Sequence, residues 1–424
     1  MMMNMIMQIL SSMLLLSAVV YAKLPVRVES KAAILMNADT GAVLYEKNKD
    51  QRAYPASITK IATALYALKH LDDLDKVVLC PSECLVRISP KVKEDHHFTH
   101  PPHWLEWDGT SYGVRKGEIL PLDALFHGMM LISGNDASNV IAHHIAGNVQ
   151  SFSQQMTAFC KELGCKSTEF RNPHGLHHPE HYTTAHDMAL ITQEALKDPR
   201  FRKIVSTLTH QRPNTNKQKS KTITQANRLL KKMTKFYYSK AFGIKTGYHK
   251  RAGYTLVAAA EHQGRVLIAV ILGSPNPVQR YRDAIGLFDA AFAEKKQKRI
   301  LFRASENVFR HTVSGAHKSL MAKLEDDIYF EYYPSEEPEL KSCLHWDLPA
   351  LPIHKDAVVG ELIVSDESGK PLIKAALHAS SEVALRPLWA LWNNKPLRFI
   401  LSALLTLICV ILAITKIHTK KTMH

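Results

Sequence analysis

The stretch Tyr54-Pro55-Ala56-Ser57-Ile58-Thr59-Lys60 places a serine and a lysine three residues apart, directly after a proline. Apolar residues recur behind it at intervals of three and four, which predicts a helix that starts at Ser57. Residues three apart share one helix face, so the side chains of Ser57 and Lys60 are expected to lie together. A serine is a poor nucleophile until a base takes its proton, and a lysine serves as that base when burial or a neighbouring cation lowers its pKa. Alone, the pair fits a capping serine and an exposed lysine equally well.

Two further motifs carry chemistry. Ser133-Gly134-Asn135 interrupts a helical pattern that runs from Leu120 to Ala146, and it places a proton-relaying hydroxyl beside a substrate-holding amide. Lys245-Thr246-Gly247 lies just before a strand at Tyr254, where it supplies a cation and a glycine that lets another backbone approach. Taken singly, the first motif also fits an ordinary interhelical turn, and the second fits a solvated strand start.

The elements around these motifs predict a helical block between strands. A hairpin is expected over Ala32 to Leu44, with its turn at Asp39 and Gly41. The other expected elements are helices over 151–163, 183–196 and 279–292, a polar loop over 211–222, and strands over 254–260 and 265–272. The first and last strands are expected to pair in one antiparallel sheet with helices packed on it, which is an α+β fold.

In this order, the three motifs resemble the active-site set of penicillin-binding proteins and β-lactamases. The closer resemblance is to the D-alanyl-D-alanine carboxypeptidases, which are low-molecular-mass penicillin-binding proteins. It rests also on Gly109-Thr110-Ser111-Tyr112, Phe170-Arg171-Asn172-Pro173-His174-Gly175-Leu176 and Thr184-Ala185-His186-Asp187-Met188. It runs from about Ala32 to Phe292 and implies a β-lactamase/transpeptidase-like antiparallel sheet covered by helices.

The resemblance implies a role for each motif residue. Ser57 would be the acylated nucleophile, Lys60 its base, and Ser133 the third catalytic residue. The backbone N–H groups of Ser57 and Tyr248 would form the oxyanion hole, and Arg280 would bind the terminal carboxylate of the substrate. The implied substrate-binding residues are Asn135, Lys245, Thr246, Gly247, Tyr248 and Arg280.

The implied reaction removes the terminal D-alanine from a peptidoglycan stem peptide, and β-lactam antibiotics would acylate the same serine. Two alternatives stay open: an endopeptidase that cuts peptidoglycan cross-links, and a catalytically silent, membrane-anchored wall-binding protein. The resemblance implies neither a cofactor nor a metal ion. The 23 histidines include His96-His97 and His177-His178, which are interpreted as solvated loops because no ligand spacing accompanies them.

The two ends of the chain predict export and a membrane anchor. Residues 1–22 have an apolar stretch closed by small residues, as in a signal peptide cleaved after Ala22. Residues 399–415 contain no charge and are long enough, with a few flanking residues, to span a bilayer core. Between the ends, we expect a catalytic domain over 23–296, a small β-rich domain over 297–385 and a juxtamembrane linker over 386–398. A basic cytoplasmic tail over 416–424 would leave the catalytic domain on the periplasmic side of the inner membrane.

Composition agrees with a globular protein near anionic polymers. The formal net charge is +15, but no dense basic block with interleaved aromatic residues is found, so nucleic acid is not an expected partner. The expected partners are the membrane lipid and the peptidoglycan. The six cysteines include the close pairs Cys80 with Cys84 and Cys160 with Cys165. Neither pair has zinc-site spacing, and in an exported chain either pair is free to oxidise.

Overall fold

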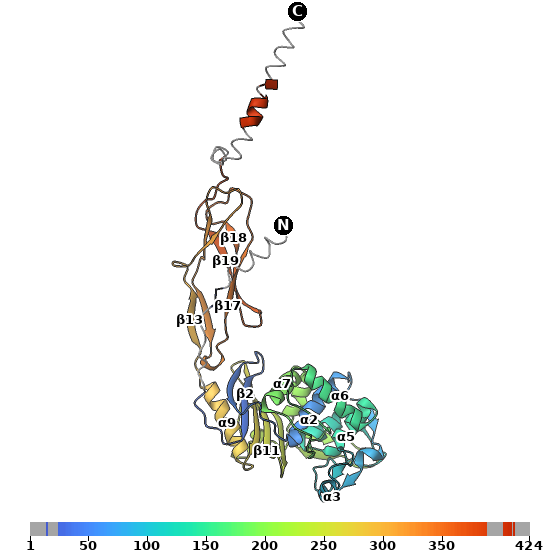
Figure 1. Ribbon diagram of the computed structural model, residues 1–424. Helices are drawn as coiled ribbons and strands as arrows, with labels where there is room; N and C mark the ends of the chain where they lie inside the picture. Colours follow the sequence, from blue (N-terminus) through green and yellow to red (C-terminus); the bar gives the residue numbers. More distant parts are fainter. Residues whose placement is uncertain (1–13, 16–23, 388–401, 409, 412–424) are drawn as a thin grey trace, which may run out of the picture. The chain divides into compact units, whose positions relative to one another are not determined.

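The computed structural model describes residues 14–15, 24–387, 402–408 and 410–411 (Figure 1). Contacts within the chain separate two compact units. The larger unit contains 21–295 together with 333–336, and the smaller unit includes 296–332 and the residues from 337 onward. All three sequence motifs belong to the larger unit.

The larger unit is built on a five-stranded antiparallel sheet with the strand order β10-β11-β12-β2-β3. Its strands are β2 (Ala32–Asn37), β3 (Val43–Lys47), β10 (Ala241–His249), β11 (Gly253–His262) and β12 (Arg265–Ser274). Strand β2 pairs with β12, so the expectation that the first and last strands share one antiparallel sheet is confirmed. The chain segment between β3 and β10 is thereby free to form the helical block.

The sheet separates two hydrophobic cores, and successive residues of its strands enter them alternately. In β2, Ala33 and Leu35 belong to the core that contains helix α9 (Gln279–Phe292), while Ile34 and Met36 belong to the core of the helical block. Figure 1 shows α9 on one face of the sheet and α2, α5, α6 and α7 on the other. A strand buried on both faces explains why 32–36 is a continuous apolar run.

Six α-helices of at least 8 residues make up the block, and shorter elements connect them. The helices are α2 (Thr59–Lys69), α4 (Leu122–Leu131), α5 (Asn135–Ala146), α6 (Val149–Glu162), α7 (Ala185–Leu196) and α8 (Pro199–Ser206). Connecting elements are β4 (Val77–Leu79) with β7 (Ile119–Pro121), β5 (Arg87–Ile88) with β6 (Leu105–Glu106), α3 (Pro90–Asp95), and the 3-10 turns Ser82–Leu85 and Arg228–Leu230. The break of the helical pattern at Ser133 and the helices expected at 151–163, 183–196 and 279–292 are confirmed.

Three local predictions need correction. Ser57 lies in a 3-10 turn, η1 (Ala56–Ile58), and the α-helix proper starts two residues later. Part of the polar segment 211–222 is not a loop, because β8 (Thr209–Arg212) and β9 (Lys221–Thr224) pair as a hairpin. Helix α8 was not predicted from the sequence, although its buried residues Phe201, Ile204 and Val205 recur at helical intervals.

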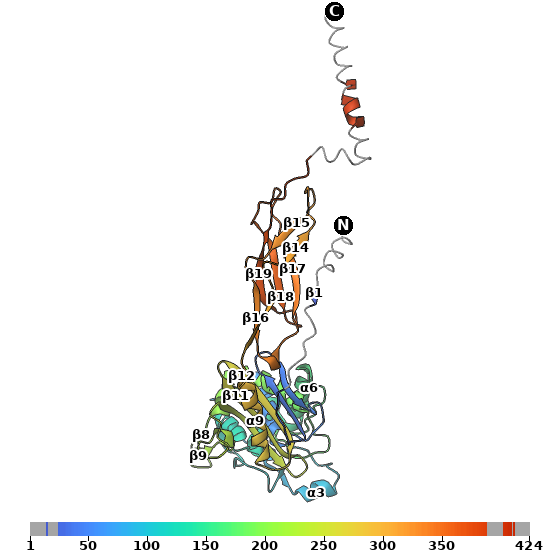
Figure 2. The ribbon, with the colours of Figure 1, turned by 90° about the vertical axis from the view of Figure 1, so that its left-hand side faces the viewer.

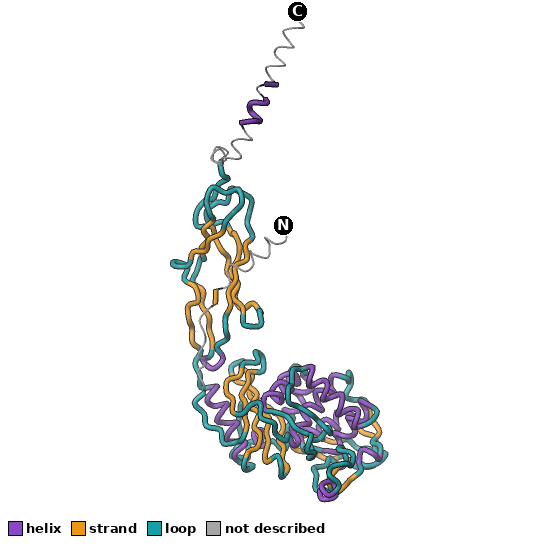
Figure 3. Tube along the Cα trace, in the orientation of Figure 1, coloured by secondary structure: helices purple, strands orange, loops and turns teal. Residues whose placement is uncertain are grey.

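Over residues 296–332 and 337–387, the smaller unit consists of strands and loops, in contrast to the helix-rich larger unit (Figures 2 and 3). One sheet has the order β1-β17-β18-β19-β15-β14, and β13 pairs with β16 in a second. Its strands are β1 (Leu14–Leu15), β13 (Gln297–Phe302), β14 (Val308–His311), β15 (Leu320–Lys323), β16 (Ile328–Tyr332), β17 (Lys341–Trp346), β18 (Val358–Ser365) and β19 (Pro371–Ala379). Leu362, Val364 and Leu377 help to form a core of its own.

The 3-10 turn η4 (Pro334–Glu336) belongs to the larger unit despite its place in the sequence. The buried guanidinium of Arg265 lies 3.0 Å from the carboxylate of Glu294 and 2.6 Å from that of Glu336. Paired buried charges of this kind are costly to separate, so the turn is held firmly to β12.

The predicted terminal segments lie largely outside the described residues. The signal segment 1–22 is described only at 14–15, and the segment 399–415 only at 402–408 and 410–411, which are helical. Within the described part of the chain, no helix combines the length and the apolar character that a membrane span requires. Among the described cysteines, Cys80, Cys84, Cys160 and Cys165 are buried free thiols, and Cys343 is an exposed one.

Candidate active site

Ser57 is presented by a strained turn at the start of the helical block. The preceding Ala56 has φ +51°, a left-handed conformation that is unusual for a residue with a side chain. Its carbonyl oxygen accepts a hydrogen bond of 2.9 Å from the hydroxyl of Thr59. The Ser57 side chain is partly exposed, while its neighbours on both sides are buried. The hydroxyl therefore reaches solvent from a rigid support.

Lys60 is fully buried directly behind that hydroxyl. Its Nζ lies 3.1 Å from Ser57 Oγ, 2.7 Å from Asn135 Oδ1 and 2.6 Å from the carbonyl oxygen of His174. Burial, and then the charge of Lys245, hold the pKa of Lys60 well below its usual value. A neutral amine has two N–H groups and one lone pair. If the two carbonyl oxygens take the N–H groups, the lone pair faces the hydroxyl of Ser57, as a general base requires.

The turn between α4 and α5 brings the second motif to the same place. Ser133 has φ +67°, and its carbonyl oxygen accepts a 2.6 Å hydrogen bond from the Thr110 hydroxyl. The backbone N–H of Asn135 donates to the carbonyl of Thr110 in return, over 3.0 Å. The side chain of Asn135 thus reaches Lys60 from a fixed backbone.

Asp136 is a buried carboxylate that the motif search did not single out. It accepts hydrogen bonds from the hydroxyl of Ser111 and from the backbone N–H groups of Tyr112, Gly113 and Val114, over 2.7 to 2.9 Å. A carboxylate with this many donors is a strong organising centre. It folds the segment after Thr110 around the second motif. Its position directly after Asn135 was the only sequence signal for it.

The Asn172–Leu176 stretch packs against the turn that carries Ser57 and against Lys60. The Asn172 side chain accepts from the N–H of Gly175 over 2.7 Å and donates to the carbonyl of Leu176 over 2.9 Å. This turn aims the His174 carbonyl at Lys60. Gly175 has φ +88°, and a Cβ there would lie 1.9 Å from the carbonyl oxygen of Ala56. Only glycine fits this contact.

His181 connects the same turn to Thr59 by hydrogen bonds, a role that the sequence did not reveal. Its Nδ1 accepts a 3.1 Å hydrogen bond from the N–H of Arg171, which leaves the proton on Nε2. Nε2 lies 2.9 Å from the Thr59 hydroxyl, which in turn donates to the carbonyl of Ala56. Burial holds the pKa of His181 well below its usual value, so the imidazole is neutral at physiological pH.

The third motif lies on β10, at the edge of the sheet, as predicted for a strand that lines a cleft. Lys245 is buried, and burial together with the charge of Arg280 lowers its pKa to about 7. A Cβ on Gly247 would lie 2.5 Å from Thr255 Oγ1 and 2.8 Å from the backbone nitrogen of Ser57. The absent side chain therefore allows β10 to lie against the nucleophile's N–H group.

Arg280 and Tyr248 lie at the far end of β10. The Arg280 guanidinium donates through Nη1 to the carbonyl oxygens of Gly247 and Thr255, at 2.9 and 3.2 Å. The Tyr248 ring is 57% exposed and stacks on the ring of Tyr254 at 4.4 Å between centroids. In this structure Arg280 first supports the strand backbone, and its predicted contact with a substrate carboxylate stays a prediction.

The structure thus brings Ser57, Lys60, Asn135 and Gly247 into direct contact or close approach. Of the remaining predicted residues, Lys245, Thr246 and Tyr248 flank Gly247 on β10, Ser133 precedes the Gly134-Asn135 turn, and Arg280 contacts the β10 backbone.

Comparison with known proteins identifies the arrangement. A family model described as D-alanyl-D-alanine carboxypeptidase matches residues 19–276. The chain belongs to this family. The D-alanyl-D-alanine carboxypeptidase DacF of Bacillus subtilis is 30% identical over 359 residues, which cover 84% of this chain and 86% of the relative. The expected family resemblance is confirmed.

Solved structures of D-alanyl-D-alanine carboxypeptidase relatives share the fold. Penicillin binding protein 5 of Haemophilus influenzae is 26% identical, with a TM-score of 0.57, over 85% of this chain and 99% of that one. The Streptomyces K15 DD-transpeptidase is 27% identical, with a TM-score of 0.54, over 64% of this chain and 99% of that one. The α+β fold with its antiparallel sheets is thereby confirmed.

Proposed function

We propose that this chain removes the terminal D-alanine from peptidoglycan stem peptides through an acyl-enzyme on Ser57. Family membership supports the reaction class. The single observation that supports the residue assignment is the contact between Ser57 Oγ and the buried Lys60, whose other neighbours are two carbonyl oxygens. Burial and the nearby charge of Lys245 favour the neutral amine beside the hydroxyl, and the carbonyl oxygens orient it.

Acylation begins when Lys60 takes the hydroxyl proton and Ser57 Oγ attacks the carbonyl between the two terminal D-alanines. The backbone N–H groups of Ser57 and Tyr248 donate hydrogen bonds to the oxyanion, and these hydrogen bonds strengthen as negative charge develops on the oxygen. Ser133 relays this proton from Lys60 to the leaving amine, the terminal D-alanine departs, and an ester remains on Ser57. Water then attacks the ester while Lys60 takes its proton, and that proton returns to Ser57 Oγ as the shortened peptide leaves.

The substrate is proposed to lie along β10. Thr246 and Gly247 pair with its backbone, as an added strand pairs with a sheet edge. Asn135 holds a substrate amide from the opposite wall. Lys245 attracts the terminal carboxylate, and Arg280 completes this anion site, while its Nη1 contacts fix the carbonyl of Gly247.

Carboxypeptidase and endopeptidase activity are separable by substrate. We expect purified enzyme to release free D-alanine from uncross-linked pentapeptide muropeptides and to leave purified cross-linked dimers largely intact over the same time. Chromatography with mass detection measures both. Faster cleavage of the dimers would favour the endopeptidase alternative, and a heat-inactivated sample controls for spontaneous hydrolysis.

Deprotonation of Lys245 is expected to lower kcat/KM as the pH rises. Because its pKa is lowered to about 7, its positive charge is lost as the pH rises through 7. We expect kcat/KM for a peptide with a free terminal carboxylate to fall by roughly tenfold between pH 7 and pH 9. The conservative variant Lys245→Arg should keep its affinity for the substrate carboxylate between pH 7 and pH 9, because arginine stays charged over this range.

A neutral ester substrate provides the control for this pH profile. It lacks the carboxylate, so its kcat/KM should not show the fall that Lys245 causes. An equal fall with both substrates would show that another group titrates.

We also propose that the chain is exported and anchored in the inner membrane. The apolar segments 1–22 and 399–415 support this proposal. The mature chain would carry its catalytic domain over 23–296 and its small β-rich domain over 297–385 on the periplasmic side. The linker 386–398, the anchoring helix and the tail 416–424 would follow.

Fractionation tests the anchor. We expect the full chain to stay in the membrane pellet after alkaline carbonate washing and a variant that ends at Arg386 to appear in the soluble fraction. N-terminal sequencing of the mature protein should begin at Lys23. Release of both forms by the wash would contradict the anchor, and a retained Met1 would contradict cleavage.

A further inference from the structure

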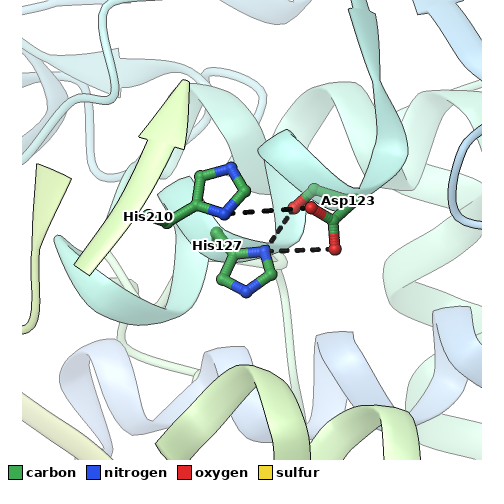
Figure 4. A group of neighbouring side chains, drawn as sticks. All are labelled: Asp123, His127 and His210. Atoms are coloured by element: carbon green, nitrogen blue, oxygen red, sulfur yellow. Dashed lines mark hydrogen bonds and ion pairs between the residues drawn. The ribbon is translucent and has the colours of Figure 1, made fainter. Parts of the chain in front are cut away.

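Three potential metal ligands converge on a site that the reaction does not use. Asp123 and His127 lie four residues apart on α4 and therefore share one helix face. His210 reaches them from strand β8, and the three side chains face one another in Figure 4. Each offers one ligand atom, and these atoms all lie within 4.8 Å of one another. No sequence spacing predicted this cluster, because its third member is remote in the chain.

The distances between the ligand atoms are close to those that a bound ion requires. His127 Nδ1 lies 3.2 Å from Asp123 Oδ1, and His210 Nδ1 lies 3.8 Å from Asp123 Oδ2. Around a tetrahedral zinc ion with bonds near 2.0–2.1 Å, ligand atoms are roughly 3.3–3.5 Å apart. The first distance already fits. The second is to the other carboxylate oxygen of Asp123, and it must shorten by a few tenths of an ångström when His210 turns toward the ion.

The burial of the cluster also suits an ion that arrives from solvent. His127 is buried, whereas Asp123 and His210 are partly exposed. The His210 ring turns its Nδ1 toward Asp123, and its Nε2 is buried without a hydrogen-bond partner among the described residues. No hydrogen bond therefore fixes the His210 ring on its Nε2 side, which leaves the ring free to turn toward an ion.

We propose that Asp123, His127 and His210 bind a divalent transition metal ion of the zinc class. Two imidazoles and one carboxylate favour such an ion over magnesium or calcium, which prefer oxygen ligands throughout. The fourth position is left for water. The imidazole rings now stack, with centroids 4.0 Å apart and 10° between their planes, and His127 Nδ1 also contacts the backbone carbonyl of Asp123. Because its partners are oxygen acceptors, His127 Nδ1 carries the ring proton in this structure. Binding must move that proton to Nε2 and turn the rings so that both Nδ1 lone pairs meet the ion.

The ion would clamp the β8–β9 hairpin to α4 and would not take part in catalysis. The hairpin already holds the segment that adjoins the second motif. Arg212 lies 2.6 Å from the buried carboxylate of Glu118 and donates to the carbonyl of Tyr112, and Gln218 donates to the carbonyl of Gly113 over 2.7 Å. A clamp at His210 thus stiffens the outer wall of the active site.

Cobalt binding to the full, tag-free chain in detergent tests the proposal. After chelator treatment, we expect one equivalent of Co²⁺ to bind, with visible absorption typical of nitrogen and oxygen ligands, and Zn²⁺ to displace it. His210→Ala and Asp123→Asn should each weaken Co²⁺ binding at least about tenfold. His345→Ala removes an exposed histidine of the smaller unit and should bind as the wild type does.

Acylation by a fluorescent penicillin verifies that each variant is folded. The wild-type cobalt spectrum carries the test even if a variant does not fold. A sulfur-to-cobalt charge-transfer band would overturn the proposal, because it would place the ion on the free cysteines. Absence of stoichiometric binding, or unchanged affinity in a folded His210→Ala, would overturn it too.

Discussion

The variant Ser57→Ala is expected to lose covalent labelling by penicillin and to release D-alanine at least ~10⁴-fold more slowly than the wild type. The residual rate would come from binding and from the oxyanion donors alone. Intact-mass analysis after incubation with penicillin measures the adduct, and quantification of released D-alanine measures turnover. Because Ser57 is partly exposed, the loss of its hydroxyl should leave the fold intact.

Ser82→Ala is the matched control for this experiment. Ser82 is exposed in a 3-10 turn of the same unit, and its removal should change neither labelling nor turnover. A penicillin adduct on Ser57→Ala would disprove the assignment of the nucleophile. Absence of labelling from the wild type, with full function retained by Ser57→Ala, would favour the silent wall-binding alternative.

Gly175→Ala is expected to damage the site without touching any reacting atom. The added Cβ would lie 1.9 Å from the carbonyl oxygen of Ala56 and would also adopt φ +88°. Relief of this clash must move the turn that carries Ser57. We expect roughly 2–5 kcal/mol of lost stability, from left-handed strain and overpacking together. We also expect about 100-fold slower acylation, since a shift near 1 Å has that effect.

Gly164→Ala separates the two causes. Gly164 also has a positive φ, +95°, but a Cβ there meets nothing within 4 Å. This variant should lose about 1–2 kcal/mol and acylate at the wild-type rate. Urea unfolding and the rate of penicillin labelling measure both quantities. Equal effects of the two substitutions would show that the close approach of Gly175 to Ala56 has no importance.

The sequence predicted those parts of the site that depend on local spacing. Ser57 and Lys60 are neighbours because one turn joins them, and the break at Ser133 follows from its turn chemistry. The place of Lys245 before a strand indicated that the motif adjoins the sheet, but it did not indicate that β10 is a strand of its own at the edge. The continuous apolar run of β2 indicated burial, although it did not indicate that two separate cores lie on either side.

Other parts depend on contacts between distant segments, which periodicity does not reveal. The second acceptor for Lys60 is a backbone carbonyl at His174, and any residue type can supply a carbonyl. The contacts of Arg280 with the backbone of β10 were not predicted, and its contact with a substrate carboxylate stays a prediction. Strand β17 has a weak apolar signal because its one fully buried residue is Ser342, while Cys343 and His345 are exposed.

The surroundings of Lys60 make reactivity a property of the finished fold. Its two carbonyl partners come from positions 75 and 114 residues farther along the chain. A newly made polypeptide, in which these segments have not yet met, carries an ordinary hydroxyl and a fully protonated lysine. Such a precursor is chemically inert toward its own substrate and toward antibiotics. A fluorescent penicillin added during refolding should therefore label only molecules in which these segments have come together. The rate at which labelling appears then measures the rate at which the active site forms.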